Sequence, residues 1–206
     1  LWDKYPVEQV ATPEGYQRDP ALVINFYNER RKQLLEVKPN CGHELLAELE
    51  KNFHVTVVTQ NIDNLHERAG SSHIIHLHGE LTKVCSSRDP HNPHYIKELK
   101  PEEYEVKMGD KAGDGTQLRP FIVWFGEAVP EIETAIQYVE KADIFVIIGT
   151  SLNVYPAAGL LHYVPRGAEV YLIDPKPVDT HTSRSIHVIQ KGASEGVAEL
   201  KQLLGV

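Results

Sequence analysis

The chain has 206 residues, 41% of them hydrophobic and 24% charged, which is ordinary for a globular protein with one sizeable core. Lys and Arg number 21 against 29 Asp and Glu, and the resulting net charge of −8 disfavours nonspecific binding to nucleic acid. No segment approaches the roughly 20 apolar residues of a membrane span, so neither nucleic acid nor a membrane is an expected partner.

The cysteine content excludes a disulfide scaffold. Only Cys41 and Cys85 occur, and they form no C-x-x-C pair. Residues 1–6 lack the basic start and apolar run of a secretory signal. These features favour a cytoplasmic protein, whereas the oligomeric state cannot be predicted.

Residues 1–50 are predicted to form a small helical module that leads into the core. Asp19 and Pro20 have the residue types of an N-cap and a first helical position, before an amphipathic run that reaches residue 37. Asn40 is expected to cap a second helix in the same way.

From residue 54 onward, short β-branched runs alternate with helical patterns, which is typical of a parallel sheet covered by helices. The predicted strands are 55–59, 73–78, 121–124, 144–148, 170–173 and 187–190. The predicted helices are 62–69, 131–141, 156–163 and 194–204. The fold class is therefore α/β, with a Rossmann-like, doubly wound parallel sheet.

Residues 81–117 interrupt this alternation. The stretch is rich in charge, Pro and Gly and has no clear apolar period, so we expect a loop-rich insertion. The expected organisation is a helical module at 1–50, a discontinuous nucleotide-binding domain at 51–80 and 118–206, and a small insertion at 81–117.

Polar residues gather where the predicted strands end, and ligands of open α/β sheets bind at the carboxyl ends of strands. The four clusters are Gln60-Asn61-Ile62-Asp63, His78-Gly79, Gly149-Thr150-Ser151 and Asp174. His76 and His78 share a strand face, and an H-x-H metal pair is one interpretation of them. No third ligand is nearby, so we favour His78 as a general base and His76 as a structural residue.

Two of these clusters keep a structural alternative. Gly149, Thr150 and Ser151 suit contacts to phosphate and ribose, but similar residues also cap helices. Asp174 is placed to bind a ribose hydroxyl, but it also precedes a proline as in an ordinary turn.

The first long helix places Tyr27 and Arg30 three residues apart on its apolar face. The arginine either buries its stem along the core or waits, with the phenol, for a carboxylate. In the segment 123–127, Trp124 and Phe125 suit core packing, whereas Gly126 suits a strand edge that accepts an extended peptide.

These residues together resemble the sirtuins, the NAD-dependent protein-lysine deacylases. The matching motifs, in family order, are "TQNIDNLHERAG", "HLHGE", "RPFIVWFGE", "IIGTSLNVYPAA" and "KGASEGVAEL". The stretch "ATPEGYQRDPALVINFYNERR" is similar to the class III members, whose Tyr-x-x-Arg pair binds the carboxylate of succinyl- or malonyl-lysine.

The resemblance implies a role for each matching residue. His78 would be the general base, and an acyl-lysine protein or peptide the partner. NAD would be bound by Gln60, Asn61, Ile62, Asp63, Gly149, Thr150, Ser151, Asp174, Gly192 and Ala193. The acyl-lysine substrate would be bound by Tyr27, Arg30, Val123, Trp124, Phe125, Gly126, Glu127, Val154 and Tyr155. The products would be 2′-O-acyl-ADP-ribose, nicotinamide and free lysine.

The chain departs from the family in three places. The family's Gly-Ala-Gly loop would precede Leu1, so we expect the printed sequence to be a fragment. The family's two zinc-binding C-x-x-C pairs are missing from residues 81–117, where Cys85, His91 and His94 fall short of the four ligands of structural zinc, and no zinc is expected. Asp174 stands where the family usually has Asn.

Two alternative functions remain. The same residues could support ADP-ribosyl transfer or NAD hydrolysis, because both begin by activating the glycosidic bond. A catalytically silent NAD sensor is the other alternative, and it would leave the intact His78 and Asp63 unexplained.

Overall fold

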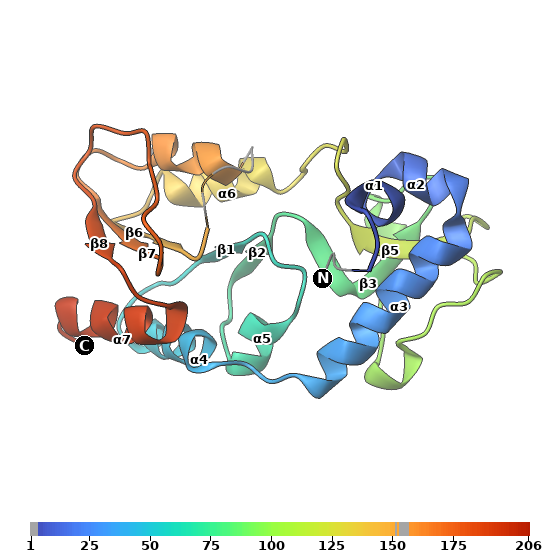
Figure 1. The fold of residues 1–206 in the computed structure, drawn as a ribbon, viewed down its shortest axis with the longest axis horizontal. Helices are drawn as coiled ribbons and strands as arrows, with labels where there is room; N and C mark the ends of the chain where they lie inside the picture. Colours follow the sequence, from blue (N-terminus) through green and yellow to red (C-terminus); the bar gives the residue numbers. More distant parts are fainter. Residues whose placement is uncertain (1–3, 151, 153–156) are drawn as a thin grey trace. The chain divides into compact units, whose positions relative to one another are not determined.

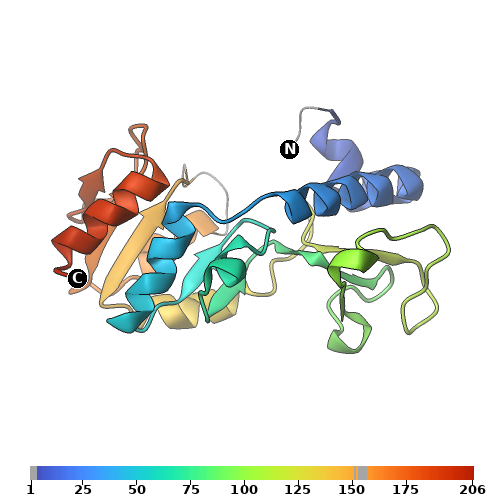
Figure 2. The same ribbon diagram turned by 90° about the horizontal axis from the view of Figure 1, so that it is seen from below.

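The computed structural model describes residues 4–150, 152 and 157–206 (Figures 1 and 2). It divides into two compact units, each built from several chain segments. The first unit comprises residues 1–38, 61–64 and 78–129, and the second comprises residues 39–60, 65–77 and 130–206. None of the described helices combines the length and apolar character that a membrane span requires.

The first unit begins with three helices, α1 (Val7–Val10), α2 (Pro13–Arg18) and α3 (Pro20–Glu36). As predicted, Asp19 caps α3, because its carboxylate accepts the N–H of Leu22 at 3.1 Å and Pro20 occupies the first helical position. One face of α3 is buried and packs beside strands β3 and β5, as Figure 1 shows.

The sheet of the first unit is antiparallel, in the order β4-β3-β5. Its strands are β3 (Gly79–Ser86), β4 (Lys97–Glu98) and β5 (Leu118–Ile122), and the short 3₁₀ helices η2 (Pro93–Tyr95) and η3 (Pro101–Glu103) lie between β3 and β5. The predicted strand at 121–124 is thus shifted toward the N-terminus. It pairs antiparallel with β3 and belongs to no parallel sheet. The stretch 81–117, expected to be dominated by loops, begins with most of an eight-residue strand.

Gly79 is required by the close approach of β3 to β5. It has a φ of +88°, and a Cβ atom at this position would lie 2.2 Å from the carbonyl oxygen of Phe121. The sequence suggested a ligand as the reason for this glycine, but the neighbour that excludes a side chain is the β5 backbone.

The second unit contains two parallel sheets in its described residues. Strands β1 (Val57–Thr59) and β2 (Ile74–His76) pair in one sheet. Strands β6 (Ile144–Ile148), β7 (Glu169–Ile173) and β8 (His187–Ile189) form the other in that order. The predicted α/β class with parallel strands is confirmed, since buried β-branched runs separated by helices lead to parallel pairing.

Helices accompany these sheets. They are α4 (Cys41–Glu48), η1 (Leu49–Lys51), α5 (Leu65–Ala69), α6 (Ile132–Val139), η4 (Ala157–Tyr163) and α7 (Ala193–Leu203). Asn40 caps α4 as predicted, through a reciprocal pair of hydrogen bonds with His43. Helices α4 and α7 lie side by side in Figures 1 and 2.

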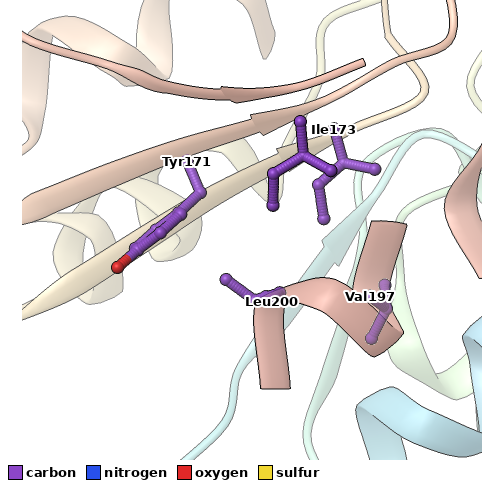
Figure 3. Packing of buried hydrophobic residues seen from close by; sticks show 5 residues of the cluster. Tyr171, Ile173, Val197 and Leu200 are labelled. Atoms are coloured by element: carbon purple, nitrogen blue, oxygen red, sulfur yellow. The ribbon is translucent and has the colours of Figure 1, made fainter. Parts of the chain in front are cut away.

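The core of the second unit lies between β7 and α7. Figure 3 shows Val197 and Leu200 of α7 beside Tyr171 and Ile173 of β7, and all four side chains are buried. A Cβ atom at Gly196 would lie 2.2 Å from the Ile173 side chain, so this helical glycine lets α7 approach the strand.

Candidate active site

His78, the predicted general base, stands immediately before β3. Its carbonyl oxygen accepts the N–H of Val123 at 2.9 Å, and this bond continues the pairing of Gly79 with Ile122. The histidine backbone is therefore joined directly to the segment predicted to bind the acyl-lysine substrate.

The segment 61–64 joins the same unit. The carbonyl of Ile62 accepts the N–H of Leu81 at 2.8 Å, three residues beyond His78. Asn61 and Asp63 flank Ile62, and Asp63 is half-buried. The structure thus places the segment 61–63 beside β3, the strand that follows His78.

The segment that follows β5 forms a tight turn. The N–H of Glu127 donates to the carbonyl of Trp124 at 3.0 Å, Gly126 has a φ of +90°, and the Phe125 side chain is 59% exposed. The N–H groups of Val123, Trp124 and Phe125 donate to His78, Glu127 and Ala11. The backbone N–H groups of these three residues are therefore already engaged within the first unit.

Arg119 holds this turn in place and was not singled out from the sequence. Its guanidinium pairs with the Glu127 carboxylate at 3.2 Å, donates to the carbonyls of Ile122 at 2.7 Å and Pro120 at 3.2 Å, and lies 3.7 Å from the centre of the Trp124 ring. The pair is well buried, with side-chain exposures of 5% and 15%. A charged residue within an otherwise buried strand was the signal in the sequence that marked it.

The Tyr27 phenol is almost fully buried and already engaged. Its hydroxyl donates to the carbonyl of Val10 at 2.9 Å and accepts the indole N–H of Trp124 at 3.0 Å. Burial raises the pKa of Tyr27 to about 12, so the phenol is neutral. Its single proton is committed to Val10, and the hydroxyl offers no further hydrogen to a carboxylate in this arrangement.

Arg30 lies next to other side chains of α3. Its guanidinium carbon is 5.1 Å from the centre of the Phe26 ring, its Nη2 is 3.8 Å from a carboxylate oxygen of Glu29, and its side chain is 11% exposed. The buried stem that the sequence offered as one alternative is present, and carboxylate binding remains a prediction for this residue.

In the second unit, two predicted cofactor residues meet across separate strand ends. The Gln60 side-chain amide donates to the Thr150 hydroxyl at 3.4 Å, and that hydroxyl also accepts the N–H of Leu152 at 3.3 Å. Gly149 has a φ of +62°, and apart from its chain neighbours no atom of the described residues lies within 4 Å of where a Cβ atom would be. The predicted residues Ser151, Val154 and Tyr155 lie outside the described residues.

The remaining predicted cofactor residues lie at the ends of β7 and β8. The Asp174 carboxylate accepts the N–H of Lys176 at 2.8 Å, which is the turn geometry expected of an Asp-Pro pair. Gly192 is the N-cap of α7 and leaves open space where a Cβ atom would be, and Ala193 begins the helix. The turn role of Asp174 is observed, and its ribose contact stays a prediction.

His76 lies beside Glu67 in the second unit. Its Nε2 lies 3.2 Å from the Glu67 carboxylate, and its side chain is 7% exposed. Burial opposes ionisation of Glu67, but the hydrogen bond and charge of His76 outweigh it and hold the pKa of this carboxyl below its usual value.

Cys85, the cysteine of the insertion, is a buried neutral thiol. Burial raises its pKa to about 12, and its Sγ donates to the carbonyl of Pro120 at 3.8 Å. Among the described residues, no cluster with metal-ligand spacing includes Cys85, His91 or His94. These three residues therefore do not form a common metal site in this arrangement.

A hydrogen-bonded cluster ties the start of the insertion to its end. The buried hydroxyl of Ser86 donates to the Asp114 carboxylate at 2.5 Å and accepts the N–H groups of Arg88 and Asp89 at 3.0 and 2.9 Å. Asp114 also accepts the hydroxyl of Thr116 at 2.6 Å. Hydrogen bonds from hydroxyl groups to the Asp114 carboxylate thus connect the start of the insertion to its end.

Comparison with known proteins identifies the family. The model of the Sir2 family matches residues 1–156. The NAD-dependent protein deacylase of Bacteroides thetaiotaomicron is 94% identical over 204 residues, covering 99% of this chain and 87% of that protein. The structure of a Sir2 homologue in complex with NAD has a TM-score of 0.85 at 34% identity and covers all of this chain and 80% of its own. A Sir2 complex with a p53 peptide and NAD⁺ has a TM-score of 0.76 at 28% identity and covers 93% of this chain and 81% of its own. The chain therefore belongs to the Sir2 family.

Proposed function

We propose that this chain, an NAD-dependent protein deacylase by its family, prefers acidic acyl groups such as succinyl and malonyl on lysine. Acetyl-lysine is a weaker substrate in this proposal. The reaction consumes NAD and one water molecule, and the products are nicotinamide, 2′-O-acyl-ADP-ribose and free lysine. The observation that carries the proposal is the largely buried cation of Arg30, three residues from the buried Tyr27 on α3.

The described residues fit a dinucleotide. Gly149 and Gly192 leave open space at two strand-end loops, and the amide of Gln60 and the hydroxyl of Thr150 cluster beside the first of these loops. NAD supplies a ribose carbon that becomes reactive toward the acyl oxygen when nicotinamide leaves. We assign Gln60 and Asn61 to the nicotinamide ribose and Asp63 to the nicotinamide amide, with Ile62 as a wall.

The other assigned cofactor residues belong to loops that follow predicted strands. Gly149, Thr150 and Ser151 are assigned to phosphate and ribose, Asp174 to the adenosine ribose, and Gly192 and Ala193 to the adenine edge. These loops provide backbone N–H groups and small side chains, which suit close approach to a dinucleotide.

His78 accepts the proton in the proposed reaction. As a neutral imidazole, His78 would take the proton from a ribose hydroxyl of bound NAD and so prepare that oxygen to bond to the acyl carbon. The carbonyl of His78 is fixed by the N–H of Val123, so the base and the substrate segment 123–127 share one backbone framework. Val154 and Tyr155 complete the assignment of the substrate contacts.

An acidic acyl group gains one charge-assisted interaction that an acetyl group lacks. A guanidinium–carboxylate hydrogen bond is worth about 1.5 to 3 kcal/mol, which corresponds to roughly tenfold to a hundredfold in discrimination. That difference is large enough to rank substrates. We also propose that acyl-lysine proteins are the partners and that the enzyme works in the cytoplasm.

The test measures nicotinamide release from NAD by the full-length protein with acetyl-, malonyl- and succinyl-lysine versions of one peptide. Arg30→Met should reduce the ratio of desuccinylation to deacetylation by tenfold or more, whereas Lys32→Met, an exposed change on the same helix, should leave it unchanged. An unchanged ratio in Arg30→Met contradicts the assignment of acyl preference.

Product analysis separates this reaction from its alternatives. Mass spectrometry should find acyl-ADP-ribose, whereas ADP-ribosylated protein or free ADP-ribose alone would indicate transfer or NAD hydrolysis. His78→Ala should abolish formation of free lysine and 2′-O-acyl-ADP-ribose, because the base acts after nicotinamide has left. Binding of NAD with no release from any acyl peptide would instead support a silent sensor.

A further inference from the structure

Arg119 and Glu127 form an ion pair beneath the segment 123–127, which the proposed function assigns to the acyl-lysine substrate. Two hydrogen bonds join the guanidinium to the carboxylate, from Nη1 to Oε2 at 3.2 Å and from Nη2 to Oε1 at 3.3 Å. The two side chains are 5% and 15% exposed. Arg119 is therefore too deeply buried to contact a peptide itself, and any effect that it has on the reaction passes through its neighbours.

The other hydrogen bonds of Arg119 hold the end of β5. Its Nη2 donates to the carbonyl of Ile122 at 2.7 Å, and its Nε donates to the carbonyl of Pro120 at 3.2 Å. All three guanidinium nitrogens are thus engaged. A buried cation with this many partners is held firmly, because each lost contact would leave a charged donor unsatisfied. Arg119 therefore fixes the point at which β5 ends and the segment 123–127 begins.

Trp124 is held at three points, and the ion pair supplies two of them. Its backbone N–H donates to Oε1 of Glu127 at 2.8 Å, and the Arg119 guanidinium lies 3.7 Å from the centre of its ring. The third contact is the indole N–H, which donates to the Tyr27 hydroxyl at 3.0 Å. Loss of the pair would leave the Trp124 backbone N–H and ring face without these partners.

The residues on either side of Trp124 connect it to the candidate base and to the first helix. The N–H of Val123 donates to the carbonyl of His78 at 2.9 Å, and the N–H of Phe125 donates to the carbonyl of Ala11 at 3.0 Å. The Phe125 side chain is 59% exposed. A displacement of Trp124 would therefore move an exposed side chain of the candidate substrate segment and the backbone that is bonded to His78.

We propose that Arg119 and the side chain of Glu127 are positioning residues, which hold the segment 123–127 in the conformation that binds the acyl-lysine peptide. This inference rests on the proposed assignment of that segment to the substrate. It gives the Glu127 side chain a different role from a substrate contact, because both of its oxygens already accept hydrogen bonds from Arg119 or Trp124. The pair acts on peptide binding, whereas Gln60 and Thr150, assigned to NAD, belong to the second unit.

The first experiment measures steady-state kinetics of the full-length protein with succinyl- and acetyl-lysine versions of one peptide, varying peptide and NAD in turn. Arg119→Met should raise the KM for both peptides by about tenfold and leave the KM for NAD within about twofold of the wild type. KM does not depend on how much of the enzyme is folded, so a purely structural role would lower the apparent kcat alone. Lys97→Met, which changes an exposed cation of the same unit, is the matched control and should behave like the wild type.

Further variants test whether the two residues act as one unit. Glu127→Gln should raise the peptide KM as Arg119→Met does, and the double variant should be no worse than either single variant. Additive effects would mean that Glu127 contacts the peptide itself, and they would overturn the proposed role. Arg119→Lys keeps the charge without the fork and should raise the peptide KM only about threefold. Should Arg119→Met fail to fold, a wild-type peptide KM in Arg119→Lys overturns the role.

Phe125→Ala separates this inference from the proposed function, because an exposed ring can be removed with little effect on folding. A raised peptide KM in Phe125→Ala, together with wild-type values in the Arg119 variants, overturns the role of the ion pair and leaves the proposed function standing. An unchanged peptide KM in Phe125→Ala overturns the assignment of the segment to the substrate, and this inference with it. A wild-type protein without a preference for acidic acyl groups overturns only that preference, since the expected rise in peptide KM applies to both acyl forms.

Discussion

The carbonyl oxygen of His78 accepts the backbone N–H of Val123 at 2.9 Å, so the candidate base and the candidate substrate segment are adjacent in one hydrogen-bonded framework. The next pair in register is Gly79 and Ile122. The position of His78 therefore depends on how closely β3 and β5 approach each other.

Gly79→Ala should unfold or severely destabilise the first unit. Its methyl group would lie 2.2 Å from the Phe121 carbonyl oxygen, and the backbone would keep a φ of +88°. Gly109→Ala is the matched control, because Gly109 has a φ of +103° and, among the described residues other than its chain neighbours, no atom lies within 4 Å of its Cβ position. Conformational strain alone costs about 1 to 3 kcal/mol, so thermal melts should show a clearly larger loss for Gly79→Ala.

Glu127→Gln should destabilise the protein by about 3 kcal/mol. The amide oxygen preserves an acceptor for the N–H of Trp124, but the change leaves the Arg119 guanidinium buried without its counter-charge. Glu103→Gln removes the partner of Lys97 in an exposed pair and should cost less than about 1 kcal/mol. Urea denaturation measures both, and equal losses would show that the buried pair contributes no more than a surface pair.

Tyr27→Phe should cost about 2 kcal/mol of stability. The change leaves the indole N–H of Trp124 and the carbonyl of Val10 without their hydrogen-bond partner in a buried region. Tyr163→Phe, at a side chain that is 45% exposed, serves as the control and should be nearly neutral.

The same Tyr27→Phe variant tests how the acyl carboxylate is bound. The Tyr27 hydroxyl donates its proton to the carbonyl of Val10. Removing this hydroxyl should therefore reduce the succinyl-to-acetyl ratio of kcat/KM less than Arg30→Met does. A larger reduction would mean that the hydroxyl leaves Val10 to bind substrate.

Asp114 should make the insertion sensitive to acid. Hydrogen bonds from Ser86 and Thr116 lower the pKa of this carboxyl from its ordinary value of 3.8 to about 2. The folded-state pKa lies below the unfolded value, so this stabilisation is complete above about pH 4 and is lost as the pH falls toward 2. Stability measured between pH 5 and 2 should fall less steeply in Asp114→Asn and in Ser86→Ala than in the wild type, and identical slopes would exclude the carboxylate as a cause.

Features that depend on neighbouring residues could be predicted from the sequence. Asp19 and Asn40 cap their helices through side chains that act within one turn. The strand at 144–148 and the parallel class of the second unit follow from apolar runs that must be buried on both faces. The polar strand ends were also predictable, and Gln60 and Thr150 do meet in the structure.

Only the tertiary structure decided that β5 pairs with β3, and this pairing explains why position 79 needs a glycine. It also decided that the Tyr27 proton goes to Val10 and that Arg119 binds Glu127. These partners come from distant or irregular segments, and hydrophobic periodicity carries no information about which backbone or charge a side chain will meet. The sequence therefore determined the family, the α/β class and the candidate chemistry, whereas long-range packing decided which polar groups remain available to a substrate.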